Sequence, residues 1–471
     1  MRKLLVATAA LLGLAGPAFA AGLIEMNPTT SPPSVGDATG VTTTPPKSGW
    51  NAPNFNPDPG KVIIRLDGLL AWDVGATGGT LNNGNVYTAG KITGTGKSQP
   101  FQYSGYFRLY FGIDGKLLNG MIWGANSEMR TNFAGETPPG YVGTGAFGSP
   151  GGNATATTYY VRRAYGYFGA PAWGLIRFGQ GDGPLSLFTT PGITTGEAFS
   201  TGAWDGDVPD LMPGNASAGW LFNDTSPEYA SNKLVYLSPT FFGLTGSVSF
   251  APNQSNLGVT ECSNSASANC YAQTSSVNAA DQSHWVNEVE GAVRYQANFG
   301  PVALDSMFGF QKSGVVNQGN FGAPETHKGV AAMDAGASLT FMGASVFGHV
   351  YGGQVNGLNT APVVTATRGT PKQWDWVAGA QYTIGPWTAG ASYYYVGNEG
   401  SAAGIGNQSF RGEAIGGTYN IAPGFNTFLE YLHGQRRQAG VNFKDSGTGV
   451  PTDFGNNVTS NGIALTMLIQ W

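Results

Sequence analysis

The chain has 471 residues and a formal net charge of −5; only 11% of its residues are charged, whereas 73 are glycine and 12% are aromatic. Globular proteins usually contain about 25% charged residues and about 7% glycine, so this composition is unusual for a soluble exported enzyme. The acidic balance excludes a nucleic-acid-binding chain on electrostatic grounds. The aromatic content argues against simple disorder.

Residues 1–20 have the pattern of a secretory signal peptide. Two basic residues precede the short apolar run Leu4 to Ala15, and Ala18-Phe19-Ala20 forms a small-x-small cleavage site. The run is too short to cross a bilayer as a stable helix, and its removal leaves a mature charge near −7. Residues 21–60 contain eight prolines, which predicts a flexible N-terminal arm without regular structure.

From residue 61 onward, apolar residues recur at every second position, which is typical of strands with one face in lipid and the other in water. This alternation predicts a first strand from residue 61, a second at about 100–114 and a third that ends near residue 130. The expected outward residues are Val62, Ile64, Leu66, Leu70, Trp72, Val74, Phe101, Tyr103, Phe107, Leu109, Phe111, Ile113, Met121 and Trp123. The inward faces carry Arg65, Asp67, Asp73, Gln102, Ser104, Arg108, Asp114, Glu128 and Arg130. Asp114-Gly115 predicts the hairpin turn after the second strand.

Short and long connections alternate along the chain. The short ones fall at 114–116, 170–173, 239–243, 300–301, 342–343, 385–386 and 422–424, and the long ones at about 76–99, 131–157, 181–227, 253–283, 313–328, 355–372, 398–407 and 437–459. Outer-membrane barrels combine short periplasmic turns, longer external loops and an even strand number, whereas a soluble β-sandwich does not require this regularity. The most apolar stretch, 329–353, is interrupted by Asp334, Met342-Gly343 and His349, which disfavours a membrane helix. The sequence therefore predicts an all-β, transmembrane, antiparallel 16-stranded β-barrel over residues 61–471.

Later strands show the same alternation. An outward face is expected at Trp285, Val289, Val293, Tyr295 and Phe299, opposite Glu288, Glu290 and Arg294, and another at Trp374, Trp376, Tyr382 and Ile384. The last strand places Ile463, Leu465, Met467, Ile469 and Trp471 outward, with Trp471 at the membrane boundary. For the strands near 344–354, 386–397 and 408–421 the sequence does not show which face is outward, because glycines on both faces leave few side chains to compare.

The connection at 181–227 is long for a loop without periodicity, and such loops are usually functional. Its charges are nearly all negative, and the acids expected at a pore constriction are Glu197, Asp205, Asp207 and Asp210. Strand parity places Arg65, Arg108, Arg130, Arg162 and Arg177 on inner faces, and it places Arg163 outward unless a β-bulge shifts the parity. We therefore expect this loop to fold into the barrel and to face a basic wall across a water-filled pore. In a second interpretation the arginines only pair with loop acids and pin the loop.

Two cysteines, Cys262 and Cys270, lie in one polar segment. Export and close spacing favour a local disulfide, and two free thiols are the alternative. The four histidines show no metal-ligand spacing with these cysteines, and no nucleophile motif has a sensible partner. We therefore predict no metal site, no catalytic site and no enzymatic activity. No cofactor is expected, although the acidic loops offer oxygen ligands for a structural Ca²⁺.

Three stretches resemble the general porins of Gram-negative outer membranes, and their residue pattern is most similar to that of alphaproteobacterial porins. The stretches are Arg162-Arg163-Ala164-Tyr165-Gly166-Tyr167-Phe168-Gly169 with Gly174-Leu175-Ile176-Arg177-Phe178-Gly179-Gln180, then residues 232–248, and the final strand with its terminal aromatic residue. The resemblance implies a homotrimer of sixteen-stranded barrels whose third external loop forms an acidic constriction opposite basic residues of the early strands. It also implies that the terminal aromatic is read by the barrel-assembly machinery. The acids of the long loop depart from the family's usual short acidic motif, and Trp471 replaces the more usual Phe.

The function expected from these features is passive diffusion of small hydrophilic solutes and ions across a Gram-negative outer membrane. The barrel would contact outer-membrane lipid and lipopolysaccharide. One alternative is a substrate-specific channel for sugars, phosphate or carboxylates, for which the inward Tyr106, Tyr110 and Tyr160 are a faint indication. A structural or adhesive barrel with a closed lumen is the other.

Overall fold

The computed structural model describes residues 58–80, 83–88, 91–97, 100–131, 159–188, 231–253, 284–316, 329–354, 372–398, 408–438 and 457–471. Several sequence predictions lie outside these residues. They are the signal peptide, nearly all of the N-terminal arm, the four candidate constriction acids Glu197, Asp205, Asp207 and Asp210, and both cysteines, Cys262 and Cys270.

Sixteen antiparallel strands close into one barrel, in which the first strand pairs with both the second and the last. The barrel strands are β1 (Val62–Gly79), β4 (Phe101–Lys116), β5 (Ile122–Thr131), β6 (Tyr159–Ala170), β7 (Gly174–Gly181), β8 (Ser231–Leu237), β9 (Leu244–Asn253), β10 (His284–Phe299), β11 (Val302–Val316), β12 (Ala331–Phe341), β13 (Ala344–Gln354), β14 (Lys372–Ile384), β15 (Trp387–Asn398), β16 (Gln408–Ala422), β17 (Phe425–Gln438) and β18 (Asn457–Gln470). The predicted strand number and closure are confirmed.

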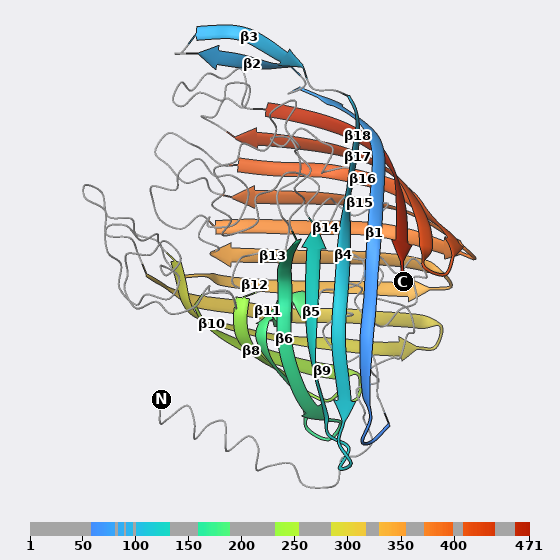
Figure 1. Cartoon of the computed structure of the whole chain (residues 1–471). Helices are drawn as coiled ribbons and strands as arrows, with labels where there is room; N and C mark the ends of the chain where they lie inside the picture. The colour runs from blue at the N-terminus through green and yellow to red at the C-terminus, as the bar shows by residue number, and fades with distance from the viewer. Residues whose placement is uncertain are drawn as a thin grey trace.

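Two further strands, β2 (Asn83–Thr88) and β3 (Lys91–Lys97), form a separate hairpin within the connection between β1 and β4. This hairpin projects beyond the ends of the barrel strands at the top of Figure 1. The described residues contain no helix that is both long and apolar enough to span a bilayer. A one-turn helix, α2 (Pro184–Leu187), follows β7 and lies against β10 and β11.

Short turns gather at one end of the barrel, and we call this end the short-turn end. One example is Gly300 and Pro301 between β10 and β11; another is Met342 and Gly343 between β12 and β13. The opposite end, where the long connections begin and end, is the long-loop end. From β4 to β17, each barrel strand therefore runs between a tight turn and a long loop, as the alternation in the sequence predicts.

The outer face of the barrel is apolar, as the parity predicts. Ile64, Leu66 and Trp72 on β1 are 68%, 61% and 43% exposed, whereas Arg65 between them is 4% exposed. The last strand repeats the pattern, because Ile463 to Ile469 are exposed at every second position. Trp471 completes this face and pairs through its backbone N–H and C=O with Gly68 of β1. Gly68 lets the Trp471 ring pack directly against β1, because the ring occupies the space of a β-carbon.

The turn after β4 lies later than the sequence predicts. Asp114 and Gly115 lie inside a longer β4, which ends at Lys116, and they pair with Gly124 and Trp123. The chain reverses instead at residues 117–121, where Gly120 has a φ of 86°. The prediction was wrong because Asp114 has a different role: its carboxylate is turned into the barrel and is held there by side-chain contacts.

Trp285 was predicted to face outward and is instead buried inside the barrel, with 1% exposure. The pairing of β10 with β11 shifts register between Val286 and Val289, and Asn287 has a φ of 53°. Asparagine tolerates this left-handed conformation better than most residues. The bulge turns Trp285 inward while Val289 and Val293 still face lipid.

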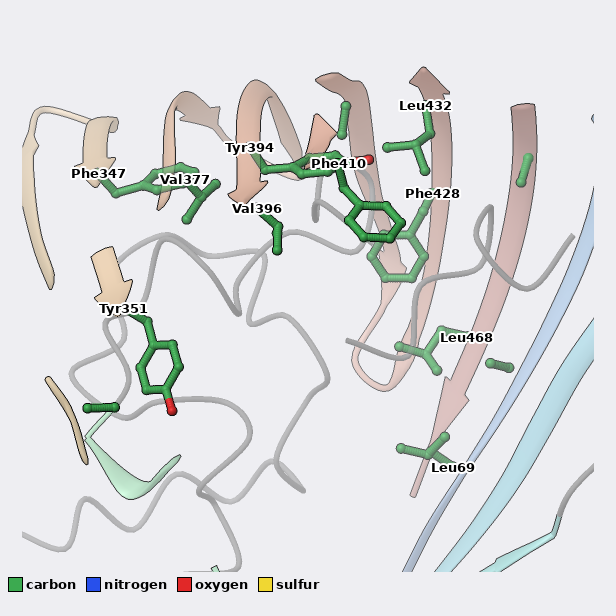
Figure 2. Packing of buried hydrophobic residues seen from close by; sticks show 14 of the residues in the cluster. Leu69, Phe347, Tyr351, Val377, Tyr394, Val396, Phe410, Phe428, Leu432 and Leu468 are labelled. Atoms are coloured by element: carbon green, nitrogen blue, oxygen red, sulfur yellow. The ribbon is translucent and has the colours of Figure 1, made fainter. Parts of the chain in front are cut away.

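Apolar and aromatic side chains cover part of the inner face, and Figure 2 shows them pointing from their strands toward the barrel interior. We call this set the apolar wall. Its members lie on β13 to β17 and are Phe347, Tyr351, Val377, Tyr394, Val396, Phe410, Phe428 and Leu432, continued by Leu468 on β18 and Leu69 on β1. The sequence left the facing of β13, β15 and β16 open, and the structure resolves it.

Candidate functional site

Six arginines occupy the inner face of five neighbouring strands, and we call them the arginine wall. They are Arg65 on β1, Arg108 on β4, Arg130 on β5, Arg162 and Arg163 on β6, and Arg177 on β7. All six are at least nine-tenths buried. Five of them are the wall arginines named from the sequence. Inward charge avoids the ~2–4 kcal/mol that a lipid-facing arginine costs at mid-depth.

A β-bulge adds Arg163 to this wall. The pairing of β5 with β6 shifts register after Glu128, so that Glu128 opposes Arg163, Met129 opposes Val161, and Arg162 is the extra residue. A bulge puts two consecutive side chains on the same side of a strand. The outward position expected for Arg163 from simple parity is therefore wrong, and the alternative of a local bulge is correct.

The Asp114 carboxylate organises the part of the wall near β1. It accepts hydrogen bonds from Arg65, through Nε and, at 3.2 Å, through Nη2, and also from the Tyr167 hydroxyl. Arg65 Nη2 also donates to Asn126 Oδ1 at 2.7 Å. The bidentate contact is the geometry in which arginine and carboxylate bind most strongly. Gly112 leaves room for it, because the guanidinium occupies the space of a β-carbon.

Glu128 is the centre of the second part of the wall. Its carboxylate contacts Arg130 Nε and Arg163 Nη1, and Arg162 Nη1 lies 3.3 Å from Oε1. Arg108 lies directly opposite Arg130 in the register of β4 and β5. One buried carboxylate therefore holds three guanidinium groups close together, and removing it would leave like charges without their counter-ion.

Arg177 completes the wall on β7. Its guanidinium lies over the ring of Tyr165, 4.1 Å from the ring centre, an arrangement that stabilises by about 2 kcal/mol when it is desolvated. The arginines of the wall outnumber the carboxylates that contact them among the described residues, which are Asp67, Asp114, Glu128 and Asp182.

The long loop after β7 enters the barrel at once. Asp182 Oδ2 lies 2.7 Å from Arg163 Nη2, so the first loop residue is bound to the arginine wall. Residues 182–188, which we call the in-folded segment, are all buried. Burial alone would raise the pKa of the Asp182 carboxyl, but the Arg163 and Arg162 guanidinium groups outweigh it and hold this pKa below its ordinary value.

The in-folded segment then docks against the inner face of the strands that follow. Leu185, Leu187 and Phe188 pack against apolar residues of β8, β10 and β11. Leu185 is fully buried, and burying one leucine side chain stabilises by about 1.5–3 kcal/mol. The described start of the loop is therefore fixed at one point by charge and at the next by apolar contact.

Glu290 on β10 supports this docking. Its carboxylate accepts a hydrogen bond from the Leu185 backbone N–H at 3.4 Å and lies 3.5 Å from Lys233 Nζ on β8. The same carboxylate fills the space that a β-carbon at Gly183 would need. Glycine therefore leaves room at this position for the Glu290 carboxylate to lie against the loop backbone.

Three tyrosines were considered as an aromatic path for sugars. Tyr110 is buried on the inner face of β4, and the side chains of Tyr106 and Tyr160 lie outside the described residues. The larger aromatic surface is the apolar wall on β13 to β17, which the sequence did not identify (Figure 2). No signal for it was readable, because in those strands glycine weakens the contrast between the two faces.

The structure also contains a groove of about 500 Å³ outside the lumen. It is walled by outward-facing residues such as Tyr236, Phe308 and Phe310, and Gly246 and Gly291 leave space between them. This groove faces lipid and is not part of the candidate pore. Among the described residues no group of His, Cys, Asp and Glu has the arrangement of a metal site.

Comparison with known proteins identifies the family. A model described as Gram-negative porin matches residues 7–439, whereas a search of curated proteins found no match.

Among solved structures the chain is similar to an anion-selective porin from Comamonas acidovorans, with 14% identity over 87% of this chain and 100% of that chain and a TM-score of 0.49. It is also similar to the outer membrane channel DcaP of Acinetobacter baumannii, with 10% identity over 87% and 97% and a TM-score of 0.49. For OmpF of Salmonella typhi in complex with daunomycin, the identity is 13% over 87% and 97%, and the TM-score is 0.48. The chain belongs to the Gram-negative porins, and it is an outer-membrane β-barrel channel for the passive diffusion of small hydrophilic solutes.

Proposed function

We propose that this porin is a general diffusion channel whose ion preference is set where the arginine wall faces the in-folded third loop. The observation that supports this proposal is the crowding of six inward arginines beside a loop that enters the barrel at Asp182. Fixed charges inside a narrow pore orient dipolar solutes and make the pore more permeable to small ions of one charge than of the other. Arginine suits this role because it stays charged throughout the physiological pH range.

The acids Glu197, Asp205, Asp207 and Asp210 belong to the same loop, and in our proposal they lie opposite the arginine wall at the constriction. The two roles considered for the arginines then hold together. Arg163 pins the loop through Asp182, and the wall as a whole supplies a positive surface along the path of the solute.

The working unit in this proposal is a homotrimer, and Trp471 is part of the signal that the assembly machinery reads. The chain has no enzymatic role and needs no cofactor. In support of this role, Trp471 directly follows β18 at the short-turn end and is half exposed on the lipid face.

One observation favours a second candidate, a channel selective for carboxylates with an apolar body. The arginine wall would bind the carboxylate, and the apolar wall, with Tyr394 and Phe410, would contact the rest of the solute. Arg436 strengthens this surface, since its guanidinium lies 5.0 Å from the centre of the Phe410 ring.

Single-channel recording of the purified oligomer in a planar bilayer tests both candidates. A general porin gives a current that rises linearly with voltage and is not blocked by small sugars, acetate or benzoate. Saturating block by benzoate, together with no block by acetate, would replace the general channel with the selective one. A barrel that inserts but gives no conductance would contradict both candidates.

A further inference from the structure

The carboxylate of Glu430 has no counter-ion among the described residues. Glu430 lies near the middle of β17, on the same inner face as Phe428 and Leu432 of the apolar wall, and it is buried. Within the part of the chain that the structure describes, neither of its carboxylate oxygens has a hydrogen-bond partner. In the arginine wall, by contrast, every carboxylate named above contacts at least one guanidinium group.

The electrostatic surroundings of Glu430 make this arrangement unfavourable. Among the described residues, the charged group that acts on Glu430 is the buried Asp73 carboxylate of β1, which is also negative. Asp73 lies opposite Thr466 of β18, and Thr466 lies opposite Phe428 of β17, so a single strand separates the two carboxylates. A buried carboxylate without a cation is costly, and a second carboxylate nearby adds repulsion. A cation bound at Glu430 would reduce both costs.

The neighbouring strands place only small residues beside Glu430. It lies opposite Gly416 of β16 on one side and opposite Ala464 of β18 on the other. The next residues in the same row are Gly390 of β15 and Gly75 of β1. None of these four residues carries more than a methyl group. A ligand bound at Glu430 therefore meets no competing side chain from this row of the barrel.

Apolar side chains border this row. Phe428 and Leu432 are the inward residues next to Glu430 on β17, and Figure 2 shows both pointing toward the barrel interior. Tyr394 of β15 and Phe410 of β16 extend the apolar surface toward the long-loop end. Apolar surface is stabilised by contact with another apolar group, and the face of an aromatic ring attracts cations. The surroundings therefore fit a ligand that combines one positive charge with an apolar body.

The ligand set at Glu430 favours an organic cation over a metal ion. Ca²⁺ takes about six to eight oxygen ligands, whereas the described residues contain no group of three or more Asp, Glu, His or Cys that could hold a metal. An ammonium group has three hydrogen-bond donors and needs no complete shell of protein ligands. A charge-assisted hydrogen bond from ammonium to carboxylate is stronger than a neutral one.

We propose that Glu430 and the adjoining part of the apolar wall form a binding site for organic ammonium ions with an apolar body. The ammonium group binds the Glu430 carboxylate, and the negative charge of Asp73 adds to the attraction. The apolar body lies against Phe428 and Leu432. This site goes beyond general diffusion, and it binds the charge opposite to that of the carboxylates considered for the selective channel.

The test is single-channel recording of the folded oligomer in a planar bilayer at neutral pH, with benzylamine as the probe. Benzylamine should reduce the current until the block saturates. Benzyl alcohol has the same apolar body without the charge, and methylamine has the charge without the apolar body. Each of these two should need a concentration about tenfold higher for half-maximal block, because each lacks one of the two contacts.

Variants assign the block to this site. Glu430→Gln should raise the half-blocking concentration of benzylamine about tenfold and leave that of benzyl alcohol unchanged. Phe428→Leu, which keeps an apolar side chain but removes the ring, should weaken the block by benzylamine about threefold. The matched control is Asp375→Asn, which removes another buried, inward carboxylate, from β14, and should leave the block by benzylamine unchanged.

Three results would overturn the proposal. Equal block of the wild type by benzylamine and benzyl alcohol would show that the charge is not recognised, and this comparison needs no variant to fold. Equal effects of Glu430→Gln and Asp375→Asn would indicate unspecific attraction by negative charge in the lumen. Half-maximal block by Ca²⁺ at a lower concentration than by benzylamine, lost in Glu430→Gln, would assign Glu430 to a metal ion. The current without any amine, recorded on the same channels, tests the proposed general diffusion separately.

Discussion

The arginine wall and the apolar wall cover different parts of one inner surface. Ion pairs hold the first together, and contacts between apolar side chains hold the second. The arginine wall is a network in which three carboxylates, Asp114, Glu128 and Asp182, each hold one or more guanidinium groups. The apolar wall has few polar contacts and consists of side chains that pack on one another (Figure 2). Glu128 alone contacts three of the six guanidinium groups, so this arc can hold several cations side by side; single buried charged residues, such as Asp375 and Glu430, also lie between members of the apolar wall.

The in-folded segment connects the arginine wall to a second apolar cluster, on β8, β10 and β11. It leaves the arginine wall at Asp182 through an ion pair and docks three residues later through Leu185 against apolar side chains. The loop is therefore held by one contact that depends on charge and one that does not. Variants that remove them separately tell which of the two sets the position of the loop.

The largest effect is expected at Glu128. Glu128→Gln leaves Arg130, Arg162 and Arg163 without their shared counter-ion, and removing one partner of a buried ion group costs about 3–5 kcal/mol. We expect a corresponding loss of unfolding free energy in urea. Glu413→Gln, which removes an outward-facing carboxylate, is the control and should change stability by less than about 1 kcal/mol. Equal effects of the two variants would show that the arginine wall does not depend on Glu128.

A smaller effect is expected at the apolar anchor. Leu185→Ala removes a fully buried side chain, and such changes cost about 2–5 kcal/mol. Because the lost contacts hold the loop and not the barrel, the variant should keep its unfolding transition but show a larger and noisier single-channel conductance. Leu429→Ala, on the lipid face, should not change conductance. A conductance of Leu185→Ala equal to that of the wild type would mean that the docked leucine does not position the loop.

The charged anchor is expected to have the smallest effect, and its pH dependence has a definite sign. The pKa of Asp182 is lowered by Arg163 and Arg162 against the effect of burial. A carboxylate with a depressed pKa stabilises the folded state above its ordinary pKa, and this contribution is lost as the pH falls through the depressed value. The current should therefore be steady from pH 7 to 5 and change below about pH 4.

Asp182→Asn provides the control for this titration. It should show at pH 7 the current that the wild type shows only in acid, and it should lose the transition below about pH 4. The anchor would be excluded as the cause if the variant kept the wild-type pH profile.

The sequence predicts the fold more completely than the site. Strand number, the outward faces of β1, β4 and β18, and the inward position of five arginines follow from a period of two and need no tertiary information. Arg163 and Trp285 were misplaced because one extra residue in a strand inverts the parity beyond it. Asp114-Gly115 has the chemistry of a turn, but the contacts of Asp114 with Arg65 and Tyr167 keep it in the strand.

The apolar wall and the loop anchors could not be predicted for another reason. Leu185 has no periodic neighbours in the sequence, and its partners Val235, Ala292 and Met307 come from three different strands. Such contacts exist only once the barrel has closed. On β13 and β15, glycine and alanine on the lipid face remove the contrast that would have marked Phe347 and Tyr394 as inward.

The central claim is that the arginine wall sets the ion preference of the pore, and the reversal potential in a KCl gradient tests it most directly. Arg108→Gln combined with Arg162→Gln removes two positive charges from the wall, and we predict that the reversal potential shifts toward cation preference relative to the wild type. The control, Lys312→Gln combined with Lys372→Gln, removes two charges outside the lumen and should leave the potential unchanged. An unchanged potential in the arginine variant, or an equal shift in both, would contradict the account.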